Sequence, residues 1–156
     1  MRSSGQRWQP NQVKRLLQQR DLNAYPASFV IHGNHEDPNG NAVPYERMTQ
    51  RSKREDLRAL RYQNWKLHVL SCFAVQTRQG IPCESDGYYR LDVKCFFVGE
   101  NHADPENVRK GIQDALFVYG DKHVIGSVGL EHVTESPRVE VVVDKLLLDG
   151  RDPRHE

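Results

Sequence analysis

The chain of 156 residues has few cysteines and no long apolar run. Its three cysteines, Cys72, Cys83 and Cys95, form no CxxC pair, which argues against a disulfide framework and a structural zinc site. We expect Cys72 and Cys95 to be small, buried apolar residues. No stretch approaches the ~20 apolar residues of a membrane-spanning helix, and the N-terminus lacks the apolar core of a secretion signal. These absences lead us to expect a cytoplasmic protein.

The length is typical of one domain and is sufficient to bury a core without covalent staples. We expect one α/β (α+β) domain, a small mixed β-sheet packed with helices, at residues 27–146. Residues 1–26 would form an N-terminal extension with a short helix at 12–20, and 147–156 a polar tail.

Strands are predicted where β-forming residues cluster or alternate with polar ones. They cover 27–32, 88–98, 124–134 and 138–143, and we expect the last two to form a hairpin. The segment 33–44 is rich in Gly, Asn, Asp and Pro, which predicts a long loop, and long ordered loops are often functional.

Two longer helices are predicted between the strands. The first covers 52–77, with Ser52 as its N-cap. Its apolar contacts are expected from Leu57, Leu60, Trp65, Leu67 and Val69. The second begins after Asp104, a good N-cap, with Pro105 in the first turn, and ends near Gly120. Its apolar face is expected at Val108, Ile112, Ala115, Leu116 and Tyr119.

Charge is divided unevenly along the chain. Residues 1–78 contain 13 Lys and Arg against 6 Asp and Glu, whereas residues 79–156 contain 9 against 15. The two halves can simply attract each other within one fold. Alternatively, the basic half contacts nucleic-acid phosphates and the acidic half holds a metal ion, which is the combination a nuclease needs. Charge alone favours the first interpretation.

A basic stretch is interleaved with Tyr62 and Trp65. Such a run is commonly a solvated helix face, but it can also contact DNA phosphates with a salt-dependent affinity. Its members are Arg47, Arg51, Lys53, Arg54, Arg58, Arg61 and Lys66.

An acidic group surrounds the start of the second long helix. Asp104, Glu106 and Lys110, with Asn107 in support, could be only a capped helix start with an i,i+4 ion pair. Asp121 weakens that interpretation, because an acid is unfavourable near a helix C-terminus. The intervening helix would span roughly 20–25 Å. A joint site therefore needs either a chain that folds back or a dimer interface.

Carboxylates without cysteine suit Mg²⁺, or Mn²⁺, better than zinc. Such ions activate water for attack on phosphate, and a nearby lysine can stabilise the developing charge. The histidines offer a weaker alternative, because His32, His35 and Glu36 do not match a zinc-hydrolase spacing. We expect His102, His123 and His132 to be surface or core residues.

The segments Asp-Pro-Glu-Asn-Val-Arg-Lys-Gly-Ile-Gln-Asp-Ala-Leu (104–116) and Gly-Asp-Lys-His-Val-Ile (120–125) resemble the core of the RusA-type Holliday-junction resolvases. The similarity spans about residues 27–146 and includes Arg-Met-Thr (47–49) and Tyr-Gln-Asn-Trp-Lys (62–66). It implies metal-binding or catalytic roles for Asp104, Glu106 and Asp121, with Lys110 assisting at the scissile phosphate. It also implies an obligate homodimer that resolves branched DNA in recombination and repair.

The sequence departs from the family at Glu106, where the family usually has aspartate. The extra methylene moves the carboxylate, and Mg²⁺ tolerates altered geometry poorly. One alternative is therefore a dimeric protein on the same fold that binds DNA junctions without cutting them. Another is a small domain that uses its uneven charge to bind a protein partner.

Overall fold

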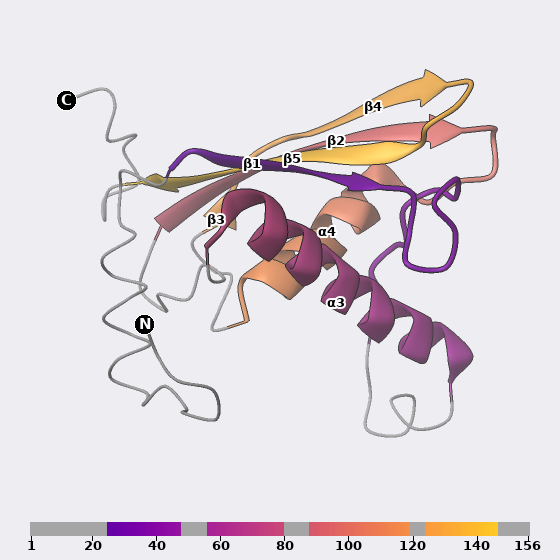
Figure 1. The fold of residues 1–156 in the computed structure, drawn as a ribbon, viewed down its shortest axis with the longest axis horizontal. Coiled ribbons are helices and arrows are strands. Elements are labelled where there is room, and N and C mark those ends of the chain that lie inside the picture. Colours follow the sequence, from indigo (N-terminus) through magenta and orange to yellow (C-terminus); the bar gives the residue numbers. More distant parts are fainter. Residues whose placement is uncertain (1–24, 48–55, 80–87, 119–123, 147–156) are drawn as a thin grey trace.

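The computed structural model describes residues 25–47, 56–79, 88–118 and 124–146. These residues form one small α+β domain, in which both helices lie on the same side of a five-stranded mixed sheet (Figure 1). The expected fold class is confirmed. The elements are β1 (Ala27–His32), α3 (Leu57–Thr77), β2 (Tyr88–Val98), α4 (Pro105–Leu116), β3 (Val124–Ile125), β4 (Val128–Val133) and β5 (Arg138–Leu146).

The predicted helix at 12–20 and the polar tail lie outside the described residues. Neither α3 nor α4 is both long and apolar enough to cross a membrane.

The sheet has the order β1-β5-β2, with β3 and β4 both beside the free side of β2. Strand β5 is antiparallel to β1 and to β2, whereas β3 and β4 run parallel to β2. Parallel neighbours need a crossover connection, and α4 supplies it between β2 and β3. This connection places the start of α4 just beyond the end of β2.

The predicted hairpin between the last two strands is wrong. Strand β2 lies between β4 and β5, so that Val93 is opposite Val141 on one side and Val128 on the other. The reason is burial. Strand β5 has alternate valines, Val139, Val141 and Val143, that are at most 1% exposed, whereas β4 has no buried residue and forms a sheet edge.

The predicted strand 124–134 is two strands interrupted at Gly126 and Ser127. Gly126 has φ of 147°, and a Cβ there would lie 1.9 Å from the carbonyl oxygen of Leu91. Ser127 donates from its backbone N–H and its hydroxyl to Asp92 Oδ1, at 2.9 and 3.0 Å. The break therefore needs glycine. The side chain of Asp92 adds to the backbone pairing there, where the Val93 N–H donates to the Ser127 carbonyl at 3.0 Å.

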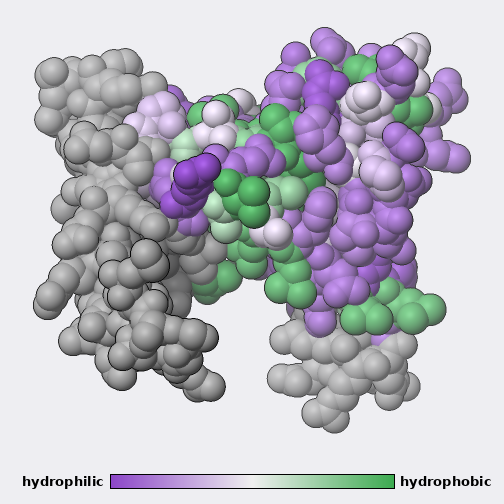
Figure 2. All heavy atoms as spheres, in the orientation of Figure 1, coloured by the Kyte–Doolittle hydropathy of each residue, from purple (hydrophilic) through white to green (hydrophobic). Residues whose placement is uncertain are grey.

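Helix α3 packs on the sheet with a different face from the one predicted. Trp65 and Val69 are buried as expected, but Leu57, Leu60 and Leu67 are 80%, 50% and 64% exposed. Aromatic residues take their place, and the full buried set is Ala59, Tyr62, Trp65, Val69 and Phe73. Hydrophobic surface is visible at the N-terminal end of α3, beside the predominantly hydrophilic β1–α3 loop (Figure 2).

The two helix boundaries also differ from the prediction. Helix α3 begins at Leu57 with Asp56 as its N-cap, not at Ser52, which lies outside the described residues. Helix α4 ends at Leu116 rather than near Gly120. Its C-cap Phe117 turns into the core, where its ring lies 5.0 Å from that of Tyr89. The helix therefore ends at the residue whose ring enters the core.

The expectation that Cys95 is a buried residue is confirmed. Cys95 is fully buried, and burial raises the pKa of its thiol to about 12. Cys72 is partly buried and packs against the core, and Cys83 lies outside the described residues.

Two side-chain amides take the place of a strand partner. The Gln76 amide accepts from the N–H of Val30 at 2.8 Å and donates to its carbonyl at 2.6 Å. The Asn41 amide does the same for Val98, at 2.9 and 2.8 Å. The first pairing joins α3 to the edge strand β1, and the second joins the β1–α3 loop to the end of β2.

Candidate active site

The start of α4 follows the end of β2 and is organised by Asp104. This residue is extended, and its Oδ1 accepts the backbone N–H of Glu106 at 3.0 Å, as an N-cap does. Its carbonyl oxygen accepts the N–H groups of Asn107 and Val108, both at 3.0 Å. The predicted cap is confirmed, with Pro105 in the first turn. The side chains of Asp104, Glu106 and Asn107 are exposed.

Lys110 lies one turn beyond Glu106 but does not form an ion pair with it. Its Nζ instead lies 4.3 Å from the centre of the Tyr45 ring. The neighbouring Arg109 turns toward the sheet and donates to the carbonyl of Leu91 at 3.2 Å. Two carboxylates and one ammonium group are therefore exposed together near the end of β2, without neutralising one another by direct contact.

The third predicted acid, Asp121, lies outside the described residues. The strand that follows it, β3, pairs with the beginning of β2 at Tyr89 and Arg90. Asp104, in contrast, follows the end of β2. Within the described ranges, no group of three or more His, Cys, Asp and Glu side chains is arranged to hold a metal ion. Asp104 and Glu106 are thus the two predicted metal ligands that the structure describes.

Several residues of the basic stretch form ion pairs with acidic side chains. Arg51, Lys53 and Arg54 lie outside the described residues. On α3, each basic residue of the stretch has an acidic neighbour: Arg58 has Asp56 at 3.7 Å, Arg61 has Glu36, and Lys66 has Asp114 at 3.1 Å.

Lys66 lies in the contact between the two helices, since its side chain is 27% exposed and faces Asp114 on α4. Arg58 and Arg61 remain more open, with 77% and 46% of their side chains exposed. Arg47 is exposed on the loop that passes the start of α4. Among the α3 cations, Arg58 and Arg61 are therefore more accessible to a ligand than Lys66.

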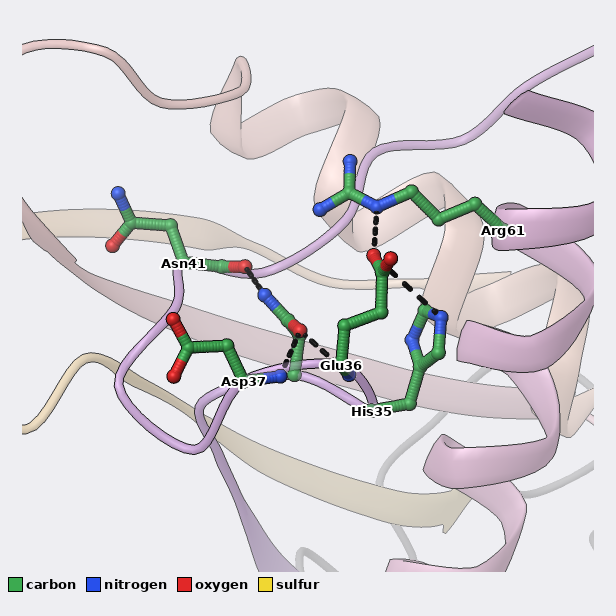
Figure 3. Close-up of polar contacts among 6 residues, drawn as sticks. His35, Glu36, Asp37, Asn41 and Arg61 are labelled. Carbon is green, nitrogen blue, oxygen red and sulfur yellow. Dashed lines mark hydrogen bonds and ion pairs between the residues drawn. The ribbon is translucent and has the colours of Figure 1, made fainter. Parts of the chain in front are cut away.

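A polar cleft of about 620 Å³ is lined by residues that include Ala103, which directly precedes Asp104 in the chain. It is formed by the β1–α3 loop, α3 and the linker 99–103. The side chains lining it include Glu36, Asp37, Arg61, Asn101 and His102. Arg61 binds Glu36 across the cleft, and the His35 ring lies beside the same carboxylate at 3.9 Å (Figure 3).

One buried amide shapes the loop that borders the cleft. Asn34 Oδ1 accepts the N–H groups of Glu36 and Asp37 at 2.9 Å each, and its Nδ2 donates to the carbonyl of Asn41 at 2.8 Å. The loop is thereby closed on itself, with Glu36 and Asp37 exposed. The expectation of a long loop is met, and its conformation is fixed by internal hydrogen bonds.

The histidines are distributed over three places. His32 is exposed at the end of β1, while burial lowers the pKa of His35 and of His68, which keeps both neutral at pH 7. His102 stacks on Phe97 at 4.2 Å, and its Nε2 lies 3.1 Å from that of His132. His123 lies outside the described residues.

Sequence reasoning missed the aromatic residues behind Lys110. Tyr45 contacts Lys110, and Tyr62 donates its hydroxyl proton to Asp114 Oδ2 at 2.6 Å. Tyr62 was visible as an aromatic residue within the basic stretch. Nothing in the local pattern paired either tyrosine with α4, because these contacts depend on how the helices pack.

No protein-family model matches the chain, and no curated protein matches it either.

Proposed function

We propose that the protein is a Mg²⁺-dependent endonuclease that cuts branched DNA, in the manner of a Holliday-junction resolvase. The observation that carries this proposal is the start of α4, where Asp104 and Glu106 are exposed beside a lysine that pairs with neither of them. Two carboxylates and an ammonium are the groups that metal-assisted phosphodiester hydrolysis requires. The resemblance to the RusA-type resolvases supports the same residues.

Asp104 and Glu106 carry the kind of oxygen donor that a divalent cation such as Mg²⁺ prefers. Mg²⁺ in phosphate-processing sites is usually held by one or two carboxylates together with water and substrate oxygens. Asp104 and Glu106 would supply these carboxylates, and Mn²⁺ would be accepted by the same oxygens. Asp121 is a third ligand only as the resemblance implies. When bound, the ion would neutralise phosphate charge and activate water.

The remaining roles belong to the side chains around these acids. Lys110 would donate hydrogen bonds to a phosphate oxygen and stabilise the charge that develops during cleavage. Arg47 would contact the DNA backbone near the scissile bond. It lies two residues after Tyr45, whose backbone N–H donates to the carbonyl of Asn107 on α4. The other basic residues of the stretch, Arg51, Lys53, Arg54, Arg58 and Arg61, would contribute to binding the DNA arms in the cytoplasm. Lys66 would stay in the contact with Asp114 between the two helices.

A homodimer is part of the proposal, because a four-way junction is two-fold symmetric and needs two opposed cuts. The outer face of α3 supports self-association. Exposed Leu57, Leu60 and Leu67 recur at the heptad spacing of paired helices, with Asn64 at a position where asparagine specifies register. In a parallel pair, the Asp56 position of one helix would lie near the Arg61 position of the other, with opposite charge.

Glu106 favours a second candidate, a dimer that binds junctions without cutting them. A longer side chain at a Mg²⁺ ligand shifts the carboxylate from the place that aspartate would give it. In this case the same surface would bind branched DNA and release no product.

The two candidates are separated by incubating the protein with a synthetic four-way junction or a matched linear duplex, with Mg²⁺ or with a chelator. We expect cleavage of the junction only with Mg²⁺, and a loss of at least about a hundredfold in Asp104→Asn with binding retained. Junction binding without product under any divalent ion would support the second candidate. Equal affinity for junction and duplex at all salt concentrations would contradict both.

A further inference from the structure

Lys110 is held by an aromatic ring rather than by the acid beside it. Residues four apart on a helix are neighbours, and a Glu–Lys pair in this order normally attracts. Here the Lys110 Nζ lies over the face of Tyr45, 4.3 Å from the ring centre, and no ion pair with Glu106 forms. The face of an aromatic ring attracts a cation, so the ring competes with the carboxylate for the same ammonium group.

Tyr45 is fixed against α4 by its backbone and its ring. Its N–H donates to the carbonyl oxygen of Asn107 at 3.0 Å. Its ring meets Tyr62 edge-to-face, with centres 5.5 Å apart and planes at 76°. Gly111 gives the loop room, because a Cβ there would lie 3.4 Å from the Tyr45 nitrogen and 3.2 Å from Tyr62 Cε1.

Tyr62 is itself fully buried and anchored. Its hydroxyl donates to Asp114 Oδ2 at 2.6 Å, and the Lys66 Nζ lies 3.1 Å from the same oxygen. A continuous series of contacts thus leads from Asp114 through Tyr62 and Tyr45 to the ammonium of Lys110. The position of Lys110 is therefore determined by packing between the loop and the two helices.

We propose that Tyr45 is a positioning residue for Lys110. Its ring keeps the ammonium away from the Glu106 carboxylate, which leaves the carboxylate available to a metal ion and the ammonium available to a phosphate oxygen. The catalytic benefit of this arrangement rests on the proposed nuclease function. The contact itself can be tested without any measurement of activity.

The first test is the NMR signal of the Lys110 Cε–Hε group in the wild-type protein, assigned by its loss in Lys110→Arg. A group over a ring face is shifted upfield. The shift should persist in Tyr45→Phe and disappear in Tyr45→Leu. In Tyr45→Leu we expect Lys110 to turn to Glu106, so adding Glu106→Gln to this variant should move the Lys110 signal. In a protein that keeps Tyr45, Glu106→Gln should leave the signal in place. Thermal unfolding of each variant verifies that it is folded.

The second test is the cleavage of a four-way junction with Mg²⁺. We expect Tyr45→Leu to lower kcat at least about tenfold with little change in KM, and Tyr45→Phe to regain most of that rate. An unshifted wild-type signal, or one that Tyr45→Leu leaves unchanged, would overturn the inference whatever the activity. Equal rates in Tyr45→Leu and the wild type would also overturn it. A wild-type protein that never cuts contradicts the proposed function, and the NMR result still decides the contact.

Discussion

Asp104 combines two roles in one side chain. Its carboxylate caps α4 by accepting the N–H of Glu106, and the same group is a proposed metal ligand. A substitution can separate these roles, because asparagine caps a helix about as well as aspartate but carries no charge. Alanine removes the cap as well as the charge.

We expect Asp104→Asn to keep the stability of the wild type while it loses cleavage. Asp104→Ala should lose cleavage and also about 1 kcal/mol of unfolding free energy, the usual value of an N-cap. Urea unfolding and junction cleavage, measured on both variants, test this prediction. If Asp104→Asn cuts the junction at the wild-type rate, Asp104 is a cap and nothing more.

Glu106 is the residue at which a single methylene distinguishes the two candidate functions. Glu106→Asp should raise the cleavage rate about tenfold, equivalent to about 1.4 kcal/mol of transition-state stabilisation. The reason is that the shorter side chain returns the carboxylate to the usual position in the resembled family. Glu106→Gln is the matched control and should abolish cleavage. A rate for Glu106→Asp below that of the wild type would show that the site is adapted to glutamate.

Single residues differ in how far the sequence predicts them. Asp104 and Pro105 could be placed correctly, because capping depends on neighbours in the chain. The Tyr45–Lys110 contact could not, because it forms between a loop and a helix that only packing brings together. The ion pair that local spacing predicts between Glu106 and Lys110 is replaced by this long-range contact.

At the scale of elements, α3 has two apolar stripes, and the sequence does not say which one meets the sheet. The leucines were predicted to be buried, yet the larger aromatic side chains Tyr62, Trp65 and Phe73 fill the core. The strands 27–32 and 88–98 were predicted correctly because their composition and alternation are strong. The hairpin was not, because a short connection between two strands does not determine which strands become neighbours.

The stability that the contact between α3 and α4 contributes is expected to depend on pH. Burial, followed by the hydrogen bond to Asp114, raises the pKa of Tyr62 above its ordinary value of about 10. As the pH rises, the Tyr62 phenol therefore loses its proton in the unfolded chain before it does so in the folded protein. The contribution of protonated Tyr62 to the free energy of unfolding is complete below about pH 10 and is lost above it. The slope is up to about 1.4 kcal/mol per pH unit.

We expect Tyr62→Phe to make this alkaline loss of stability shallower, because the variant has no phenol to titrate. At neutral pH the same variant should be less stable by about 1 kcal/mol, since it lacks the hydrogen bond to Asp114. Urea unfolding at pH 7, 9, 10 and 11 tests both statements. Identical slopes in the two proteins above pH 10 would contradict the assigned role of Tyr62.

At the scale of the whole molecule, the proposed dimer can be tested through the exposed face of α3. Leu60→Lys combined with Leu67→Lys should weaken self-association at least about a hundredfold, because a two-fold interface loses each contact twice. Analytical ultracentrifugation over a range of concentrations measures this change. Ile125→Lys, which alters an exposed apolar residue on β3, is the control and should leave the dimer intact.

A monomeric wild-type protein would contradict the homodimer, and an intact dimer in the double variant would exclude this face. The proposal also predicts that the monomeric variant binds a four-way junction more weakly. A linear duplex should be affected less, because it does not present two symmetric sites.

The amide of Gln76 has a consequence for how the molecule avoids aggregation. Strand β1 is at an edge of the sheet, and an open edge is a template for strands from other molecules. Gln76 occupies both hydrogen-bonding groups of Val30, in the middle of that strand. A strand from a neighbouring molecule would have to displace this side chain before it could add to the sheet. The long helix thus contributes to the core with one face and, with one glutamine, obstructs the addition of a strand at the β1 edge.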